Sequence, residues 1–314
     1  MSSSVSTPAR SGLVYLVGAG ILWGTGGLLG TLLHRATGLA PVSVATCRLA
    51  VGGLLLMILL AGTRRPWPRN ATAWRRIGAV AVLAATFQAA YFGAVAASSV
   101  SLATLITIGT SPVVVAVVEH VTGRRAVDRR RAATIGIALC GLALLVGVPT
   151  GNTGTAGLLV GAALAAVAAT AFATVTVINA VPVPGLDATT TIALGFTGGA
   201  LLLAPLAATS GLGFDPTPGS VALVVLLGLA PTAVAYTLYF RGLSDSGPGI
   251  AAVLALLEPL TGATLAAVVL GERLTAPGVA GAALLIVALL LTATPARPAV
   301  QGPDSAAERR HARD

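Results

Sequence analysis

The sequence predicts an all-α integral membrane protein of ten transmembrane helices, arranged as two five-helix inverted repeats, with both termini cytoplasmic. Three observations predict this fold: a very apolar composition, ten apolar runs of membrane-spanning length, and an internal repeat. Of 314 residues, 55% are hydrophobic and only 9% are charged, against roughly 25% charged in an average soluble domain. A soluble globule could not bury that much apolar surface, so the composition excludes that class.

The charge distribution argues against a nucleic-acid partner. A formal net charge of +9 would suggest one in a soluble protein. All 19 cations are Arg, however, and most lie in short segments between apolar runs rather than along one helix face. Ten of them form two clusters, Arg64, Arg65, Arg69, Arg75 and Arg76, then Arg124, Arg125, Arg129, Arg130 and Arg131. This pattern indicates membrane topology.

Polar interruptions divide the chain into ten spans of roughly 20 residues, the length needed to cross the hydrocarbon core as a helix. The first repeat, 13–148, holds spans 13–33, 39–61, 76–97, 100–121 and 131–148. The second repeat, 157–293, holds spans 157–178, 187–208, 220–240, 248–270 and 276–293. We expect a cytoplasmic tail over 1–12, an extracytoplasmic linker over 149–156, and a disordered cytoplasmic tail over 294–314.

The orientation follows from the Arg residues, because short cytoplasmic loops carry the excess of positive charge. With the N-terminus inside, sixteen Arg residues fall on the cytoplasmic side. Only Arg35 and Arg273 fall on the other side, and Arg48 lies within a span. Both termini are therefore predicted to be cytoplasmic, in a bacterial plasma (inner) membrane.

The internal repeat has a spacing of about 147 residues. VGGLLLMILLA at 51–61 aligns with GGALLLAPLAA at 198–208, and Tyr91-Phe92 aligns with Tyr239-Phe240. Further along, Ser111-Pro112 aligns with Glu258-Pro259. Because each repeat has an odd number of spans, the second must enter the membrane from the opposite side, as in many secondary transporters.

Two charged residues lie near the middle of spans. Arg48 is ten residues into the second span and Glu258 is eleven residues into the ninth. A charge at the centre of a span costs at least about 2.5 kcal/mol on insertion scales, so it must face protein or water. We predict that both line a substrate cavity, where they bind charged substrate groups or pair across the halves. The alternative is an ion pair or hydrogen bond with a purely structural role.

Prolines and amphipathic side chains complete the predicted site. Pro259 frees a backbone carbonyl one turn earlier, and Pro112 occupies the corresponding place, so paired helix breaks are expected at the midplane. The alternative is a pair of kinks that only shape packing. Pro231 is expected in the first turn of its span, where proline is tolerated. Side chains able to stack on or hydrogen-bond a substrate, or else to serve only packing, are Trp23, Gln88, Tyr91, Tyr236 and Tyr239.

Five motifs stand out along the chain: Trp23-Gly24, Arg48-Leu49, Ser111-Pro112, APTAVAYTLYFRGL at 230–243 and above all LLEPLTGATLAAVVLGERLT at 256–275. In these motifs the chain resembles the EamA-type permeases of the drug/metabolite transporter superfamily. The resemblance implies two five-helix inverted repeats around a central cavity that transports amino acids, other metabolites or toxic compounds. One departure is Arg125, where the first repeat has no acidic counterpart of Glu272. Glu119 lies earlier on that helix, at an end where we expect it to be solvated.

These observations predict a secondary transporter that works by alternating access and exports a small organic molecule. The expected partners are a small-molecule substrate and membrane lipids, with protons as a hypothesis that rests on Glu258. No cofactor, metal site or catalytic residue is expected, and the chain is expected to be a monomer or homodimer. The alternatives are an intramembrane enzyme acting on a lipid-linked substrate and a membrane scaffold without transport.

Overall fold

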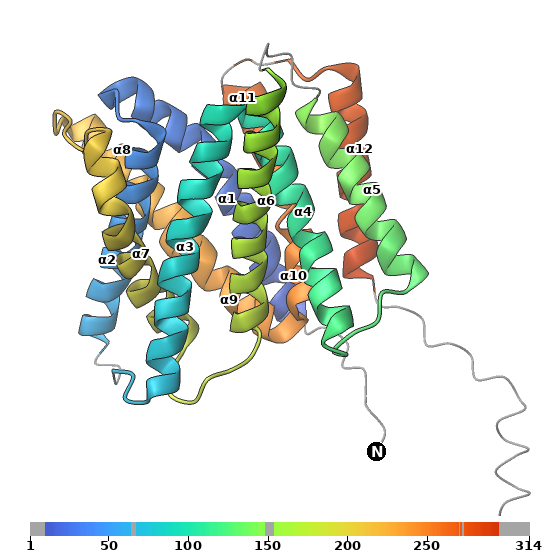
Figure 1. Ribbon diagram of the computed structural model, residues 1–314, viewed down its shortest axis with the longest axis horizontal. Coiled ribbons are helices and arrows are strands. Elements are labelled where there is room, and N and C mark those ends of the chain that lie inside the picture. Colours follow the sequence, from blue (N-terminus) through green and yellow to red (C-terminus); the bar gives the residue numbers. More distant parts are fainter. Residues whose placement is uncertain (1–9, 64–66, 148–153, 270, 272, 295–314) are drawn as a thin grey trace, which may run out of the picture.

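The computed structural model describes residues 10–63, 67–147, 154–269, 271 and 273–294. They form a bundle of helices that run between two faces (Figure 1). We call the face where α1 begins and α12 ends the termini face, and the other the opposite face. The elements are α1 Arg10–Thr37, α2 Pro41–Gly62, α3 Ala71–Ala97, α4 Val100–Val121, α5 Arg129–Val146, α6 Thr155–Asn179, α7 Ala188–Thr209, α8 Pro218–Gly228, the π-helical η1 Leu229–Val234, α9 Ala235–Ser246, α10 Pro248–Leu254, α11 Leu257–Val269 and α12 Ala276–Ala293.

The ten predicted spans all correspond to helical segments. In the described residues, nine segments are long and apolar enough to cross a membrane. The remaining predicted span is α5, an 18-residue helix whose first three residues are Arg. Side chains fix several helix starts: Ser99, Asp128 and Asp187 each accept a hydrogen bond from the backbone N–H three residues later. The prediction of an all-helical membrane protein is confirmed.

The eighth span is interrupted in its middle. It runs from Pro218 to Ser246 and changes from α8 to the π-helical η1 before continuing as α9. Pro231 lies inside η1, so the prediction of a first-turn proline is wrong. Proline lacks a backbone N–H and its ring clashes with the preceding turn, which a wider π turn accommodates.

The two midplane prolines behave differently, and the prediction of paired breaks is wrong for the first half. Before Pro259 the ninth span breaks between α10 and α11. Pro112 lies inside an uninterrupted α4. In α4 the Ser111 hydroxyl donates at 3.1 Å to the Ile108 carbonyl, which Pro112 leaves without its usual donor. In the second half Glu258 occupies the Ser111 position, and the Ala255 carbonyl accepts instead from the Glu258 backbone N–H at 3.0 Å, within the break.

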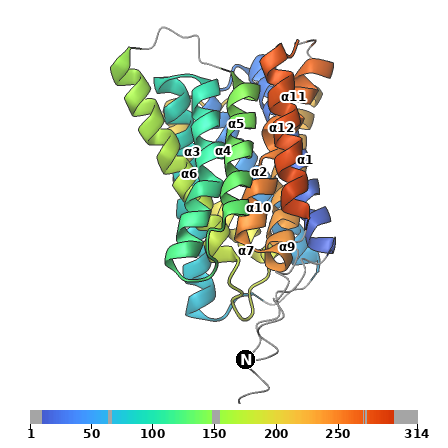
Figure 2. The ribbon, with the colours of Figure 1, turned by 90° about the vertical axis from the view of Figure 1, so that its right-hand side faces the viewer.

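The packing between the halves reflects the inverted repeat. Helix α1 packs against α9 and α11, just as α6 packs against α3 and α4. Helices α2 and α7, which correspond to each other, are also in contact, as are α5 and α12 at one edge of the bundle (Figure 2). Glycines permit two further equivalent contacts, of α2 with η1 and of α7 with α3. Gly52 lies against Thr232, and Gly199, 147 residues later, lies against the α3 backbone at Ala81.

Candidate functional site

A cavity of about 440 Å³ lies at the centre of the bundle. Its walls are mostly apolar and aromatic, with a few polar groups, and they come from both halves of the chain. The lining residues are Trp23, Gly26, Gly27, Gly30, Thr31, His34, Pro41, Val44, Ala45, Arg48, Phe87, Gln88, Tyr91, Phe92, Val95, Val100, Thr104, Thr107, Ile108, Ser111, Phe172, Leu227, Tyr236, Ala255 and Glu258.

The cavity extends toward the opposite face of the bundle. Its outer lining comes from the end of α1 at His34, the start of α2 at Pro41, the end of α3 at Val95 and the start of α4 at Val100. These four helix ends lie on the face away from the termini (Figure 1). His34, Pro41 and Val100 are exposed. The structure therefore has its cavity mouth on the opposite face.

Arg48 is held in the cavity wall by the π-helical segment. Its Nε donates to Thr232 Oγ1 at 3.0 Å, and its Nη2 reaches the Pro231 carbonyl at 3.5 Å. The Thr232 hydroxyl in turn donates to the Leu227 carbonyl at 3.0 Å. Departure from regular helix at η1 thus provides both acceptors for the guanidinium. The other donors of the guanidinium make no hydrogen bond to a described residue.

Glu258 lies in the first turn of α11, directly after the break in the ninth span. Its carboxylate makes no hydrogen bond or ion pair within the part of the chain that the structure describes. Arg48 is close enough for the two charges to interact, but the two side chains do not form an ion pair among the described contacts. The cavity therefore contains one guanidinium group and one carboxyl group, each with capacity to bind something else.

Aromatic rings form the floor of the cavity on the side of the termini face. The Trp23 ring lies 4.9 Å from that of Tyr236 and 4.8 Å from that of Tyr239, centroid to centroid. Phe172 joins the group at 5.8 Å from Trp23. Trp23 is only 4% exposed, and its indole N–H has no hydrogen-bond partner in the described structure. A buried N–H of this kind is costly unless it finds an acceptor.

The structure brings most of the predicted site residues together. Tyr239 is buried behind the cavity, with its hydroxyl 2.8 Å from Thr176 Oγ1. Pro112 and Pro259 shape α4 and the start of α11 without lining the cavity. The six predicted residues that line it are Trp23, Arg48, Gln88, Tyr91, Tyr236 and Glu258. Their roles in binding stay predictions.

Several lining residues were not identified from the sequence. Thr104, Thr107 and Ser111 form a hydroxyl stripe along α4 and face the cavity. Their spacing of three and four residues is the signal that could have found them, because such residues share one helix face. Phe87 and Phe172 carried no comparable signal, since a lone aromatic residue in an apolar span is most often a packing residue.

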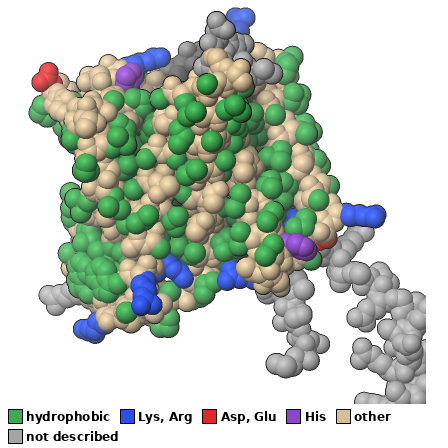
Figure 3. All heavy atoms as spheres, viewed as in Figure 1, with side chains coloured by type: hydrophobic (Ala, Val, Ile, Leu, Met, Phe, Trp, Pro, Cys, Tyr) green, Lys and Arg blue, Asp and Glu red, His purple; other side chains and the backbone are tan. Residues whose placement is uncertain are grey.

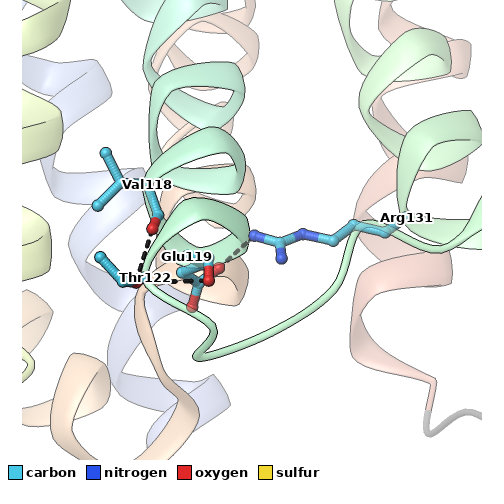
Figure 4. A network of polar contacts seen from close by, with 4 residues as sticks. All are labelled: Val118, Glu119, Thr122 and Arg131. Atoms are coloured by element: carbon cyan, nitrogen blue, oxygen red, sulfur yellow. Dashed lines mark hydrogen bonds and ion pairs between the residues drawn. The ribbon is translucent and has the colours of Figure 1, made fainter.

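An ion pair lies at the termini-face ends of α4 and α5. Glu119 was expected to be solvated there, but it is only 5% exposed and pairs with Arg131 (Figure 4). Arg131 reaches from the first turn of α5 to the last turn of α4. Gly249, at the start of α10, lies directly against the pair: a Cβ there would lie 2.9 Å from a Glu119 carboxylate oxygen. The pair therefore packs against the second half.

The described residues contain no cluster of three His, Cys, Asp or Glu side chains suited to a metal ion.

Comparison with known proteins agrees with this architecture. A chain from Bacillus subtilis (strain 168), the uncharacterized transporter YwfM, is 29% identical over 280 residues, which cover 88% of this chain and 92% of that one. A solved crystal structure shares the fold with a TM-score of 0.73 at 19% identity, over 90% of this chain and 96% of that one. The model of the EamA-like transporter family matches twice, at residues 10–147 and 159–294. The chain belongs to the EamA-like transporter family, and it is a multi-pass membrane transporter.

Proposed function

We propose that this protein is a secondary transporter that exports a small organic metabolite by alternating access, with the substrate bound in the central cavity. The observation that carries the proposal is the pair of opposite charges, Arg48 and Glu258, in one cavity between inverted repeats without an ion pair between them. Ionisable side chains at membrane depth are costly, and they commonly mark a substrate or ion path.

The cavity chemistry indicates the kind of substrate. Spare N–H groups of Arg48 suit a carboxylate, while Glu258 suits an ammonium or hydroxyl group. The rings of Trp23, Phe87 and Tyr236 supply an apolar wall beside these two groups. At about 440 Å³ the cavity falls within the range of about 300–1,000 Å³ typical of small-molecule sites. An amino acid or a similar metabolite with an apolar body fits these features.

The termini face is proposed to be cytoplasmic, in a bacterial plasma membrane. On the side of the molecule drawn in Figure 3, more Arg side chains lie along the lower edge, which is the termini face, than along the upper edge, and a mostly uncharged belt lies between the two edges. This distribution agrees with the excess of Arg in short cytoplasmic loops. The cavity mouth of this structure would then face outward, and export would require loading from the termini face.

Proton coupling through Glu258 is a hypothesis, motivated by its position as a carboxylate in the cavity near mid-span. Replacement of Glu258 by Gln removes the group that would bind and release the proton. In reconstituted vesicles, Glu258→Gln should therefore abolish the dependence of transport on a pH gradient, while transport down the substrate's own gradient persists. Unchanged dependence on the pH gradient would refute this hypothesis.

A growth screen tests the proposed function and its direction. An overexpressing strain is grown on amino acids, their analogues and toxic compounds, with an Arg48→Gln strain as the matched control. Export predicts resistance that the control strain lacks, whereas import predicts sensitisation. A membrane scaffold predicts no difference between the strains for any compound, and an enzyme predicts chemical change of the compound.

A further inference from the structure

A second pocket, of about 290 Å³, opens at the termini face. It lies between the start of α3, the end of α6, the connection that follows α6, the start of α7 and the end of α9. Arg76, Asn179 and Arg241 are among its polar lining residues. Arg76 donates to the carbonyl of Ile178 at the end of α6 and to that of Val181 just after it, which positions its guanidinium at the pocket wall.

The internal repeat relates this pocket to the mouth of the central cavity. Several lining residues of the pocket have counterparts 147 or 148 positions earlier that line the cavity mouth. The corresponding pairs are Asn179 with Thr31, Ala188 with Pro41, Thr191 with Val44, and Phe240 with Phe92. An inverted repeat places such counterparts on opposite faces of the membrane. The pocket therefore lies on the termini face at the position that the repeat relates to the cavity mouth.

A thin aromatic barrier separates the two hollows. The Tyr239 ring lies 4.8 Å from that of Trp23, which lines the cavity. The ring of Tyr236, which lines the cavity, lies 6.5 Å from that of Phe240, which lines the pocket. Tyr239 is 1% exposed, and its hydroxyl is 2.8 Å from Thr176 Oγ1 on α6. Its counterpart Tyr91, by contrast, is half-buried and lines the open cavity. Two equivalent tyrosines thus occupy one open and one closed environment.

We infer that this pocket is the closed mouth of the transport path on the termini face, and that the Tyr239–Thr176 contact is its gate. The inference rests on the proposed function. When the halves exchange conformations, Tyr239 enters the wall of a cavity open to the termini face and Tyr91 becomes buried. The pocket lining carries two guanidinium groups, Arg76 and Arg241, against one carboxylate, Asp187. That balance favours a substrate with a negatively charged group, the same group that Arg48 suits.

The test measures access to the cavity from each face and needs no known substrate. Ala255 lines the cavity at the break in the ninth span and is 5% exposed. In a protein whose own cysteines are replaced (Cys47→Ala and Cys140→Ala), Ala255→Cys is labelled with a membrane-impermeant maleimide in sealed vesicles of either orientation. The lipid-facing Val82→Cys, at a position 55% exposed, gives the background rate.

Ala255→Cys should react with the maleimide from both faces. Adding Tyr239→Phe should raise the labelling rate from the termini face about two- to tenfold, because one neutral hydrogen bond that closes the path is lost. Asn179→Trp fills the pocket and should reduce labelling from the termini face to background while labelling from the opposite face persists. That persisting rate also reports correct folding. Ser244→Trp, on α9 in the pocket wall, is a second plug, and Val127→Trp, in an exposed loop between α4 and α5, is the control that should change neither rate.

The outcomes separate the two proposals. If Ala255→Cys reacts from the termini face at a rate that neither plug changes, the path runs elsewhere and this inference is overturned, while alternating access stands. If Ala255→Cys never reacts from the termini face, even with Tyr239→Phe, the cavity does not alternate and the proposed function fails with the inference.

Discussion

At the scale of single residues, the cavity depends on how two charges are held. Arg48 and Glu258 could be found from the sequence, because a charge within an apolar span is conspicuous. Thr232, which accepts from Arg48, could not, because a hydroxyl in an apolar segment more often bonds to the preceding turn of its own helix. The sequence also could not show that Tyr239 lies behind the open cavity, since spacing gives the helix face but not the depth of a side chain.

Thr232 positions the Arg48 guanidinium. Thr232→Val keeps the shape of the side chain and removes the acceptor for Arg48 Nε. Because the guanidinium is charged and partly buried, we expect a loss of about 1.5–3 kcal/mol of stability, the range for hydrogen bonds to charged groups. Thermal unfolding in detergent measures it. Thr232→Ser retains the hydroxyl and should lose much less, and an equal loss in both variants would contradict this role.

At the scale of elements, hydropathy predicts where spans lie but not where they are interrupted. Hydropathy carries no information about which backbone carbonyls lack a hydrogen-bond donor. The π turn at Pro231 and the continuity of α4 past Pro112 therefore could not be predicted from it. Next to Pro112 the Ser111 hydroxyl bonds to the Ile108 carbonyl and α4 continues. At the aligned Glu258-Pro259 pair a backbone N–H bonds to the Ala255 carbonyl instead, and there the helix breaks.

Contact between α5 and α12 requires glycine at position 281. A Cβ there would lie 2.5 Å from both the Gly141 carbonyl oxygen and the Leu145 backbone nitrogen, neither of which can move aside easily. Gly281→Ala should therefore destabilise the protein by about 1–3 kcal/mol, as overpacking typically does. The unfolding midpoint in detergent measures the change. Gly136→Ala, where a Cβ meets nothing within 4 Å, is the control, and equal midpoints for the two variants would disprove this close approach.

The buried Glu119–Arg131 pair joins α4 to α5 and packs against α10. Removal of one partner leaves the other charge buried alone, so Glu119→Gln and Arg131→Met should each cost on the order of 3 kcal/mol. The double variant should cost clearly less than the sum of the two. A double-mutant cycle of unfolding free energies measures this coupling, with the exposed Arg125→Gln as a near-neutral control. Simple additivity would mean that the two side chains do not interact.

At the scale of the whole molecule, the sequence was most informative about the two repeats, because a register kept over three spans is hard to produce by chance. It could not show that the repeats differ in state, with the mouth at Tyr91 open and the equivalent region at Tyr239 closed. Neither charged cavity residue has a charged counterpart in the other repeat: Gly195 corresponds to Arg48, and Ser111 corresponds to Glu258. The two repeats thus share their helix arrangement but not the charged residues of the cavity.

Counterflow in proteoliposomes tests the central claim most directly, that substrate crosses the membrane through this cavity. Vesicles loaded with an unlabelled compound from the growth screen are diluted into the labelled compound. The wild-type protein should accumulate label transiently, Arg48→Gln should lose most of that accumulation, and the lipid-facing Val82→Ala should match the wild type. Absence of counterflow in the wild type, or full counterflow in Arg48→Gln, would contradict transport through a cavity that uses Arg48.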